Sequence, residues 1–196
     1  MSTTVALVGR TNVGKSSLFN KLAKSKSALV SEQEGLTRDI KSASVKMEGK
    51  SVNFIDTGGF FTSKDDEFEE IILSKAYEAI EIADMILFVV DKKFGISPFD
   101  REIASLIRKS NKEVIMVINK IDVKTIEGTS IFEELGFKEK IEVSAEHNLG
   151  VDQLKDLIFS KVKEEENFSE TNIPKICILG KPNVGKSSTI NSILNE

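Results

Sequence analysis

The sequence predicts an α/β fold, a mostly parallel six-stranded sheet with helices on both faces. Short apolar, β-branched runs alternate along the chain with segments whose apolar residues recur at helical spacing. The first apolar run, Thr4–Val8, leads into a glycine-rich loop and then into a helical pattern. Polar motifs follow several of the other runs, where ligands of parallel sheets bind. These three observations indicate an open sheet with a binding site along one edge.

The expected strands are short and mostly rich in valine, isoleucine and phenylalanine, a composition that suits a sheet buried on both faces. The stretch Met47–Ser51 between two of them contains a glycine and predicts a hairpin, which adds one antiparallel edge strand. The strands are expected at Val5–Val8, Ser44–Met47, Val52–Ile55, Met85–Val90, Val114–Ile118 and Lys140–Val143.

The expected helices are segments with apolar residues three or four apart. One of them follows Ser97-Pro98, a capping residue and a first-turn proline that together mark a helix start. Helical patterns are found at Ser17–Leu22, Glu67–Ile82, Phe99–Lys109 and Leu149–Val162.

Length and composition leave room for one complete α/β domain and a remnant. The chain has 196 residues, 40% of them hydrophobic, and a net charge of −4, which argues against wholesale nucleic-acid binding by this segment. Its one cysteine, Cys177, lies in an apolar run, so we expect a buried side chain rather than a disulfide or a zinc ligand. The sequence shows no signal peptide and no run of membrane-spanning length, so we expect a cytoplasmic protein with no membrane partner.

Residues 9–16 fit the pattern G-x-x-x-x-G-K-S, whose backbone N–H groups cradle phosphate. Strand, loop and helix follow in the order that aims these N–H groups and a helix N-terminus at an anion. A glycine-rich connection without a ligand is the alternative. We expect nucleotide contacts from Gly9, Arg10, Thr11, Asn12, Val13, Gly14, Lys15, Ser16 and Ser17.

A second motif, N-K-x-D at residues 119–122, directly follows an expected strand. The Asp122 carboxylate is able to accept two hydrogen bonds from guanine that adenine does not offer, and such sites reject the wrong analogue by roughly 10⁴-fold. The aliphatic stem of Lys120 would cover one face of the base, and Asn119 would tie the loop to its neighbours. A surface turn is the alternative interpretation.

The segment Ser144-Ala145-Glu146 follows the last expected strand, and the backbone N–H of Ala145 is expected to donate to the guanine carbonyl. The next residue, His147, is the only histidine; we expect it to be exposed and give it no catalytic role. Together with the phosphate loop, this pocket predicts GTP and GDP as ligands.

Hydroxyl and carboxylate oxygens in three segments are expected to hold Mg²⁺ while Lys15 neutralises the outer phosphates. Ser16 and Thr37 would supply the hydroxyls, the latter from a polar segment that orders only around a γ-phosphate. The Asp56 carboxylate would act through a water, and Gly59 would let a backbone N–H approach the terminal phosphate. The motif that follows the third expected strand consists of Asp56, Thr57, Gly58 and Gly59.

Ras-like hydrolases have a water-orienting glutamine at the position that Phe60 occupies here, and a phenylalanine side chain does not hydrogen-bond water. The amide oxygen of Asn12 is expected to bind a monovalent cation beside the phosphates, which would supply the missing positive charge. The residues with expected catalytic roles are Lys15, Thr37, Gly59 and Asn12. The residues expected to hold metal ions are Ser16, Thr37, Asp56 and Asn12.

A second copy of the phosphate-loop pattern, Gly180–Ser187, follows another apolar run near the end of the chain. The acidic, polar stretch before it indicates a linker. We expect a first GTP-binding domain at residues 1–163, the linker at 164–174 and the truncated start of a second GTP-binding domain at 175–196. The second copy lacks an N-K-x-D motif of its own, so we expect it to be silent here and the chain to be the N-terminal part of a longer protein.

These motifs resemble the Der (EngA) family, bacterial GTPases with two tandem GTP-binding domains. The resemblance implies a P-loop GTPase fold, potassium-stimulated GTP hydrolysis with an apolar residue at the Phe60 position, and a role in assembling the large ribosomal subunit. It also implies that the subunit or its rRNA is bound through parts missing from this chain. The chain departs from the commonest family pattern at Thr11, Ser17 and Glu34, none of which removes an expected ligand. The segments that carry the resemblance are Gly9–Ser16, Gly35–Asp39, Asp56–Gly59, Asn119–Asp122, Ser144–Glu146 and Gly180–Ser187.

Two other functions remain open from the sequence. Phe60 is compatible with a nucleotide-gated adaptor whose hydrolysis is negligible. A single-domain GTPase of tRNA modification is disfavoured by the second loop. The sequence does not indicate an oligomeric state.

Overall fold

The computed structural model describes residues 2–24, 29–31, 41–47, 49–57, 68–124 and 128–162, with the backbone alone for 29–31 and 68–72. All of them belong to the first of two units into which the chain divides, Met1–Glu165 and Glu166–Glu196. The expected linker, the second glycine-rich loop and Cys177 lie outside the described residues, so the expected domain boundaries stay a prediction.

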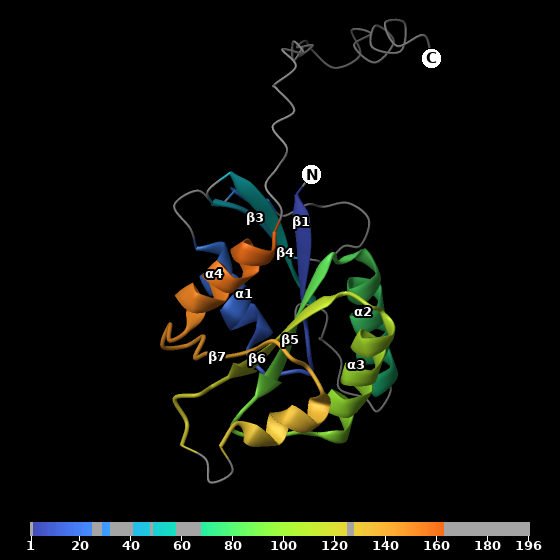
Figure 1. Ribbon diagram of the computed structural model, residues 1–196. Helices are drawn as coiled ribbons and strands as arrows, with labels where there is room; N and C mark the ends of the chain where they lie inside the picture. The colour runs from blue at the N-terminus through green and yellow to red at the C-terminus, as the bar shows by residue number, and fades with distance from the viewer. Residues whose placement is uncertain are drawn as a thin grey trace, which may run out of the picture. The chain divides into compact units, whose positions relative to one another are not determined.

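A seven-stranded sheet with the order β2-β3-β4-β1-β5-β6-β7 forms the centre of this unit (Figure 1). β1 pairs in parallel with both β4 and β5, and the parallel ladder continues through β6 to β7. The predicted α/β fold with a mostly parallel sheet is therefore confirmed. The strands are β1 (Thr3–Val8), β2 (Leu29–Ser31), β3 (Lys41–Met47), β4 (Lys50–Asp56), β5 (Met85–Asp91), β6 (Glu113–Asn119) and β7 (Lys140–Glu142).

The sheet has one strand more than the six that the sequence predicts. β2 is three residues long and pairs antiparallel with β3, in a segment for which the sequence predicts no strand. A run of three residues is too short to show the alternation that marks a strand. The predicted β3–β4 hairpin is confirmed, with Met47 opposite Lys50 and Gly49 at φ 77°, but β3 is not the edge strand, because β2 lies outside it.

The helices cover both faces of the sheet, as predicted. Helices α1 (Lys15–Ala23) and α4 (Val151–Lys161) lie on one face, and α2 (Phe68–Ile82) and α3 (Pro98–Lys109) lie on the other (Figure 1). A 3₁₀ helix, η2 (Ser130–Leu135), was not predicted; it adds buried side chains to the α2–α3 side. Among the helices that the structure describes, none is long and apolar enough to cross a bilayer.

Helix α3 begins at Pro98, one residue before the predicted start at Phe99. Ser97 is the N-cap, and its Oγ accepts a hydrogen bond from the backbone N of Asp100 at 3.1 Å. The Asp100 carboxylate accepts in return from the Ser97 backbone N at 2.9 Å. With Pro98 in the first turn, this reciprocal capping box determines where the helix starts.

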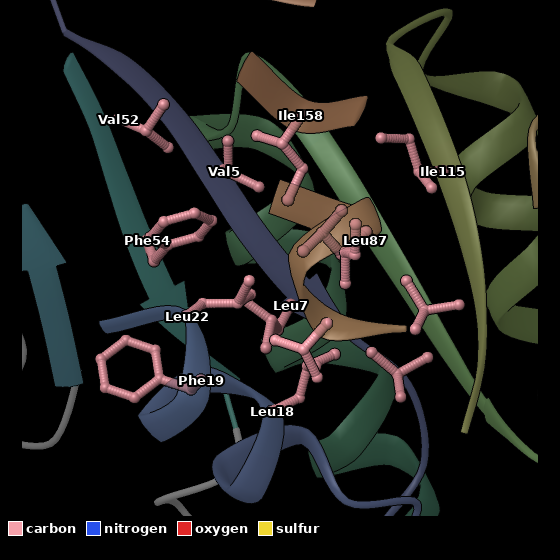
Figure 2. Close-up of a cluster of buried hydrophobic side chains, with 14 of the residues drawn as sticks. Val5, Leu7, Leu18, Phe19, Leu22, Val52, Phe54, Leu87, Ile115 and Ile158 are labelled. Carbon is pink, nitrogen blue, oxygen red and sulfur yellow. The ribbon is translucent and has the colours of Figure 1, made fainter. Parts of the chain in front are cut away.

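Two apolar cores lie on the two faces of the sheet. Along β1, Val5 and Leu7 belong to the core on the α1–α4 side, and Ala6 and Val8 belong to the core on the α2–α3 side. This alternation follows from the two-residue period of a strand. Figure 2 shows the first core, in which side chains of α1 and α4 pack on the sheet; the labelled ones are Val5, Leu7, Leu18, Phe19, Leu22, Val52, Phe54, Leu87, Ile115 and Ile158.

The carboxyl ends of the central strands meet at one edge of the sheet. Leu7 of β1 lies opposite Asp56, the last residue of β4. Asp91 and Asn119, the last residues of β5 and β6, lie opposite each other. The loops that carry the sequence motifs leave from these ends, so the parallel topology brings motifs distant in sequence to one place.

Candidate functional site

The phosphate loop joins β1 to α1 and passes through left-handed backbone at Asn12 (φ 61°) and Gly14 (φ 97°). A Cβ atom at Gly14 would collide with the amide nitrogen of Asn119, and one at Gly9 would collide with the carbonyl oxygen of Val89. Only glycine therefore allows the loop to pack so closely against β5 and β6.

Helix α1 begins directly after this loop, at Lys15, two residues before the predicted start. Its N-cap, Gly14, brings no side chain to the helix N-terminus. The N–H groups of the first turn have no partner within the helix, and the N-terminus carries a partial positive charge. Ser16 and Ser17 are exposed in this turn. The helix start therefore has the properties of an anion site.

Lys15 lies over the loop and is buried, at 4% exposure. Its Nζ donates to the carbonyl oxygens of Gly9 and Arg10, at 2.8 and 2.6 Å. Burial lowers the pKa of the ammonium from 10.5 to about 8, and the nearby Asp56 carboxylate offsets part of this shift. The loop thus holds a desolvated cation, as expected of a group that neutralises phosphates.

Asn119 connects the phosphate loop to the segment after β7. Its Nδ2 donates to the carbonyl oxygen of Val13 at 2.8 Å, and its Oδ1 accepts from the backbone N of Ala145 at 3.0 Å. The side chain is fully used in this way and the residue is buried, at 2% exposure. The expectation that Asn119 ties the loop to its neighbours agrees with these contacts.

The Ala145 N–H donates to Oδ1 of Asn119 at 3.0 Å. The physical reason is that a buried amide oxygen needs a donor, and Ala145 is itself buried beside it. Ala145 therefore helps to hold the Asn119 side chain in place. The expected hydrogen bond from the Ala145 N–H to the guanine carbonyl stays a prediction.

Lys120 has left-handed backbone, with φ 65°. Its Nζ donates to the carbonyl oxygen of Asn12 at 2.7 Å and to Oδ2 of Asp91 at 2.6 Å. Lys120 is thus attached to the phosphate loop. The sequence interpretation missed Asp91, although its position directly after the apolar run Met85–Val90 was the available signal.

The Asp122 side chain is 25% exposed, and its carboxylate is ionised at neutral pH. A hydrogen bond from Ser144 lowers the pKa of Asp122, and the charges of His147 and Lys120 lower it further. His147 Nε2 lies 3.7 Å from Asp122 Oδ2, and the histidine side chain is 57% exposed, in agreement with the expected exposed position. Guanine recognition requires an ionised carboxylate, which only accepts hydrogen bonds, to face the N–H donors of the base.

The expected magnesium ligands are described only in part. Asp56 is fully buried at the end of β4, and the next residue, Thr57, is anchored by a hydrogen bond from its Oγ1 to the carbonyl oxygen of Leu7 at 2.8 Å. The residues outside the described part of the chain are Thr37, Gly58, Gly59 and Phe60. Within the described ranges, no group of three or more histidine, cysteine, aspartate or glutamate residues is placed to hold a metal ion.

Arg10 belongs to the phosphate loop, but its side chain contacts α3 and the connection that precedes it. The Nε atom lies 3.4 Å from Oδ2 of the fully buried Asp100, and the guanidinium lies 5.6 Å from the centre of the Phe94 ring. An Arg10 contact with phosphate would therefore come from the backbone.

Residues 4–120 and 175–196 match the sequence pattern of the 50S ribosome-binding GTPase family. The chain belongs to this family. The matched stretches include both glycine-rich loops, at residues 9–16 and 180–187. Both copies of the phosphate-loop pattern therefore lie in stretches that match this family.

Curated relatives confirm the resemblance to Der. GTPase Der of Finegoldia magna is 43% identical over 194 residues, which is 98% of this chain and 44% of the relative. GTPase Der of Azobacteroides pseudotrichonymphae is 46% identical over 198 residues, which is 100% of this chain and 45% of the relative. The chain spans less than half the length of these relatives.

Solved structures with the same fold include Era and the G domain of FeoB. A variant of Aquifex aeolicus Era bound to GDP and AlF4⁻ has a TM-score of 0.64 at 32% identity, covering 85% of this chain and 59% of that one. Era in complex with MgGDPNP and part of 16S ribosomal RNA has a TM-score of 0.66 at 30% identity, covering 90% and 59%. The FeoB G domain of T. maritima has a TM-score of 0.59 at 27% identity, covering 82% and 98%.

Proposed function

We propose that the described site binds GTP and GDP and hydrolyses GTP to GDP and phosphate. The observation that carries this proposal is the pair of Asn119 hydrogen bonds, which joins the phosphate loop to the loop after β7. The two joined loops would hold the two ends of one nucleotide, its phosphates at the phosphate loop and its base at the loop after β7. Membership of a GTPase family and likeness to nucleotide-bound Era support the same function.

The described residues divide the work of binding between the two ends of the nucleotide. The ionised Asp122 accepts hydrogen bonds from guanine, while the stem of Lys120 covers the base. The loop N–H groups and the start of α1 bind the phosphates. The Lys15 ammonium, already stripped of water by burial, meets the outer phosphates without a further desolvation cost.

The donors present fit Mg²⁺. The Ser16 hydroxyl and the Asp56 carboxylate are hard oxygen ligands, and phosphate oxygens would complete the coordination. A magnesium ion held there would spread and neutralise phosphate charge during phosphoryl transfer. We extend the proposal to Thr37 as the second hydroxyl and to Gly59 as a backbone donor to the terminal phosphate.

Potassium stimulation is a further part of the proposal. Asn12 is exposed in the phosphate loop, and its backbone carbonyl already accepts from Lys120. The side-chain amide oxygen would be a ligand for K⁺ beside the phosphates. A cation there would supply positive charge to a site whose water-orienting position is occupied by Phe60.

For the longer protein we propose a cytoplasmic role in assembling the large ribosomal subunit. The family is described as 50S ribosome-binding, and the curated relatives are Der GTPases. Contacts with the subunit or its rRNA would involve parts beyond this chain.

Base selection tests the proposed function in the full chain. Wild type should bind fluorescent GDP and reject xanthosine diphosphate, and Asp122→Asn should reverse this preference by roughly 100-fold or more, because the amide reverses one donor–acceptor pair. Asp156→Asn, on the exposed side of α4, is the matched control and should leave the preference unchanged. Lys15→Ala should abolish binding, since the second loop is expected to be silent. An unchanged preference in Asp122→Asn would contradict the pocket assignment.

A further inference from the structure

Asp91 is a buried carboxylate that the binding scheme above does not use. It closes β5 opposite Asn119, and the residue is only 1% exposed. Both carboxylate oxygens have partners: Oδ1 accepts from the backbone N of Lys93 at 2.8 Å, and Oδ2 accepts from Lys120 Nζ at 2.6 Å. A buried charge is costly unless it is paired in this way, so its presence at the edge of the site needs an explanation.

The ion pair extends into the phosphate loop through Lys120. Its Nζ also donates to the carbonyl oxygen of Asn12 at 2.7 Å, so one ammonium joins the end of β5 to the loop. Asn12 and Lys120 both have left-handed backbone, with φ 61° and 65°. Two residues in this less favourable conformation need support from their surroundings. Asp91, at the end of β5, is in place to give Lys120 that support.

We infer that Asp91 is a positioning residue for nucleotide binding. By holding the Lys120 ammonium, it keeps the lysine stem in place as a platform for the base and keeps the phosphate loop in its binding shape at Asn12. The inference rests on the proposed nucleotide-binding function. It gives β5 a role in a site whose sequence motifs all follow other strands. A preformed site binds more tightly because less ordering occurs on binding.

Asp91→Asn distinguishes the positioning of Lys120 from the hydrogen bond that Asp91 accepts from the backbone N of Lys93. The asparagine oxygen still accepts from the backbone N of Lys93. The new amide NH₂ then faces the Lys120 ammonium, so two donors meet and the attachment of the lysine is lost. Asp91→Ser, whose hydroxyl accepts from the same backbone N, is a second variant in case Asp91→Asn does not fold.

A double-mutant cycle with Lys120→Met tests the inference by titration with fluorescent GDP. We expect Asp91→Asn to weaken GDP binding about tenfold in the wild-type background, equivalent to about 1.4 kcal/mol. In the Lys120→Met background, where no ammonium remains to be positioned, it should weaken binding less than about twofold. Asp84→Asn is the matched control at the other end of β5; Asp84 accepts from the Thr4 backbone N at 2.7 Å, and its substitution should change binding less than about twofold.

The possible outcomes are distinguishable. If Asp91→Asn weakens binding by the same factor in both backgrounds, the carboxylate affects binding through the fold and not through Lys120, and the inference is wrong. The inference is also wrong if Asp91→Asn and Asp91→Ser both bind GDP like wild type. Wild type that does not bind GDP at all would contradict the proposed function itself.

Discussion

Replacing Asn119 by alanine should destabilise the fold and weaken nucleotide binding together. The side chain is buried, and both of its polar atoms are used, one by the carbonyl oxygen of Val13 and one by the N–H of Ala145. Both partners belong to residues that are 1% exposed. Their polar groups would therefore lose their hydrogen bonds away from bulk water.

The expected size follows from these two lost bonds. A buried donor or acceptor left without a partner costs about 1–3 kcal/mol, so the two together cost about 2–6 kcal/mol. We expect the free energy of unfolding of the nucleotide-free chain to fall by about 4 kcal/mol, the middle of this range. The affinity for GDP should fall as well, since the same bonds hold the phosphate loop against the base-pocket loops.

Urea denaturation of the nucleotide-free full chain measures the first effect, with the transition midpoint compared at an unchanged slope. Asn53→Ala is the matched control, because Asn53 lies on β4 and, among the described residues, its side chain has one weak hydrogen bond, from Ser44 Oγ at 3.4 Å. It should cost less than about 1 kcal/mol. The reasoning fails if Asn119→Ala costs no more than Asn53→Ala, or if it destabilises the fold while GDP affinity stays at the wild-type value.

Three further predictions concern other charged or polar groups of the same unit. Because the pKa of Lys15 is about 8 without ligand and phosphate charge raises it, GDP binding at pH 9 should take up roughly one proton, measurable by calorimetry in buffers of different ionisation enthalpy. Asp100→Ala should lower the free energy of unfolding by about 3–5 kcal/mol, since it leaves Arg10 without its buried partner, whereas Glu134→Ala, at an exposed ion pair, should cost less than about 1 kcal/mol. Asn12→Ala should turn over GTP at the same rate in potassium and in sodium; a variant that kept a potassium response would place the ion elsewhere.

Local patterns in the chain predicted the strands and helices well, because each depends on residues that are neighbours in sequence. The start of α3 is the clearest case: Ser97 and Pro98 marked it, and the structure adds the reciprocal bond with Asp100. Short elements were harder, since Leu29–Ser31 and Ser130–Leu135 contain too few residues to show a period. The predicted edge position of β3 was wrong because the short strand β2, which lies outside it, was not predicted.

The loop motifs were likewise visible in the sequence, because their residue types and spacing are local. Their partners were not. Nothing near Lys120 indicates that its ammonium meets Asp91, 29 positions earlier, or that Arg10 meets Asp100. These pairs depend on which strands are adjacent and on their register.

The sequence by itself therefore determined the fold class, the family and the chemistry of the nucleotide motifs, since these follow from short stretches of residues. Only the tertiary structure decided how the motifs are held together. In it, Asn119 joins Val13 to Ala145, which are 132 positions apart in the sequence, and the buried Asp91 holds the ammonium of Lys120. The physical reason is that parallel pairing of β5 and β6 brings their carboxyl ends together, and burial then requires each polar group there to find a partner.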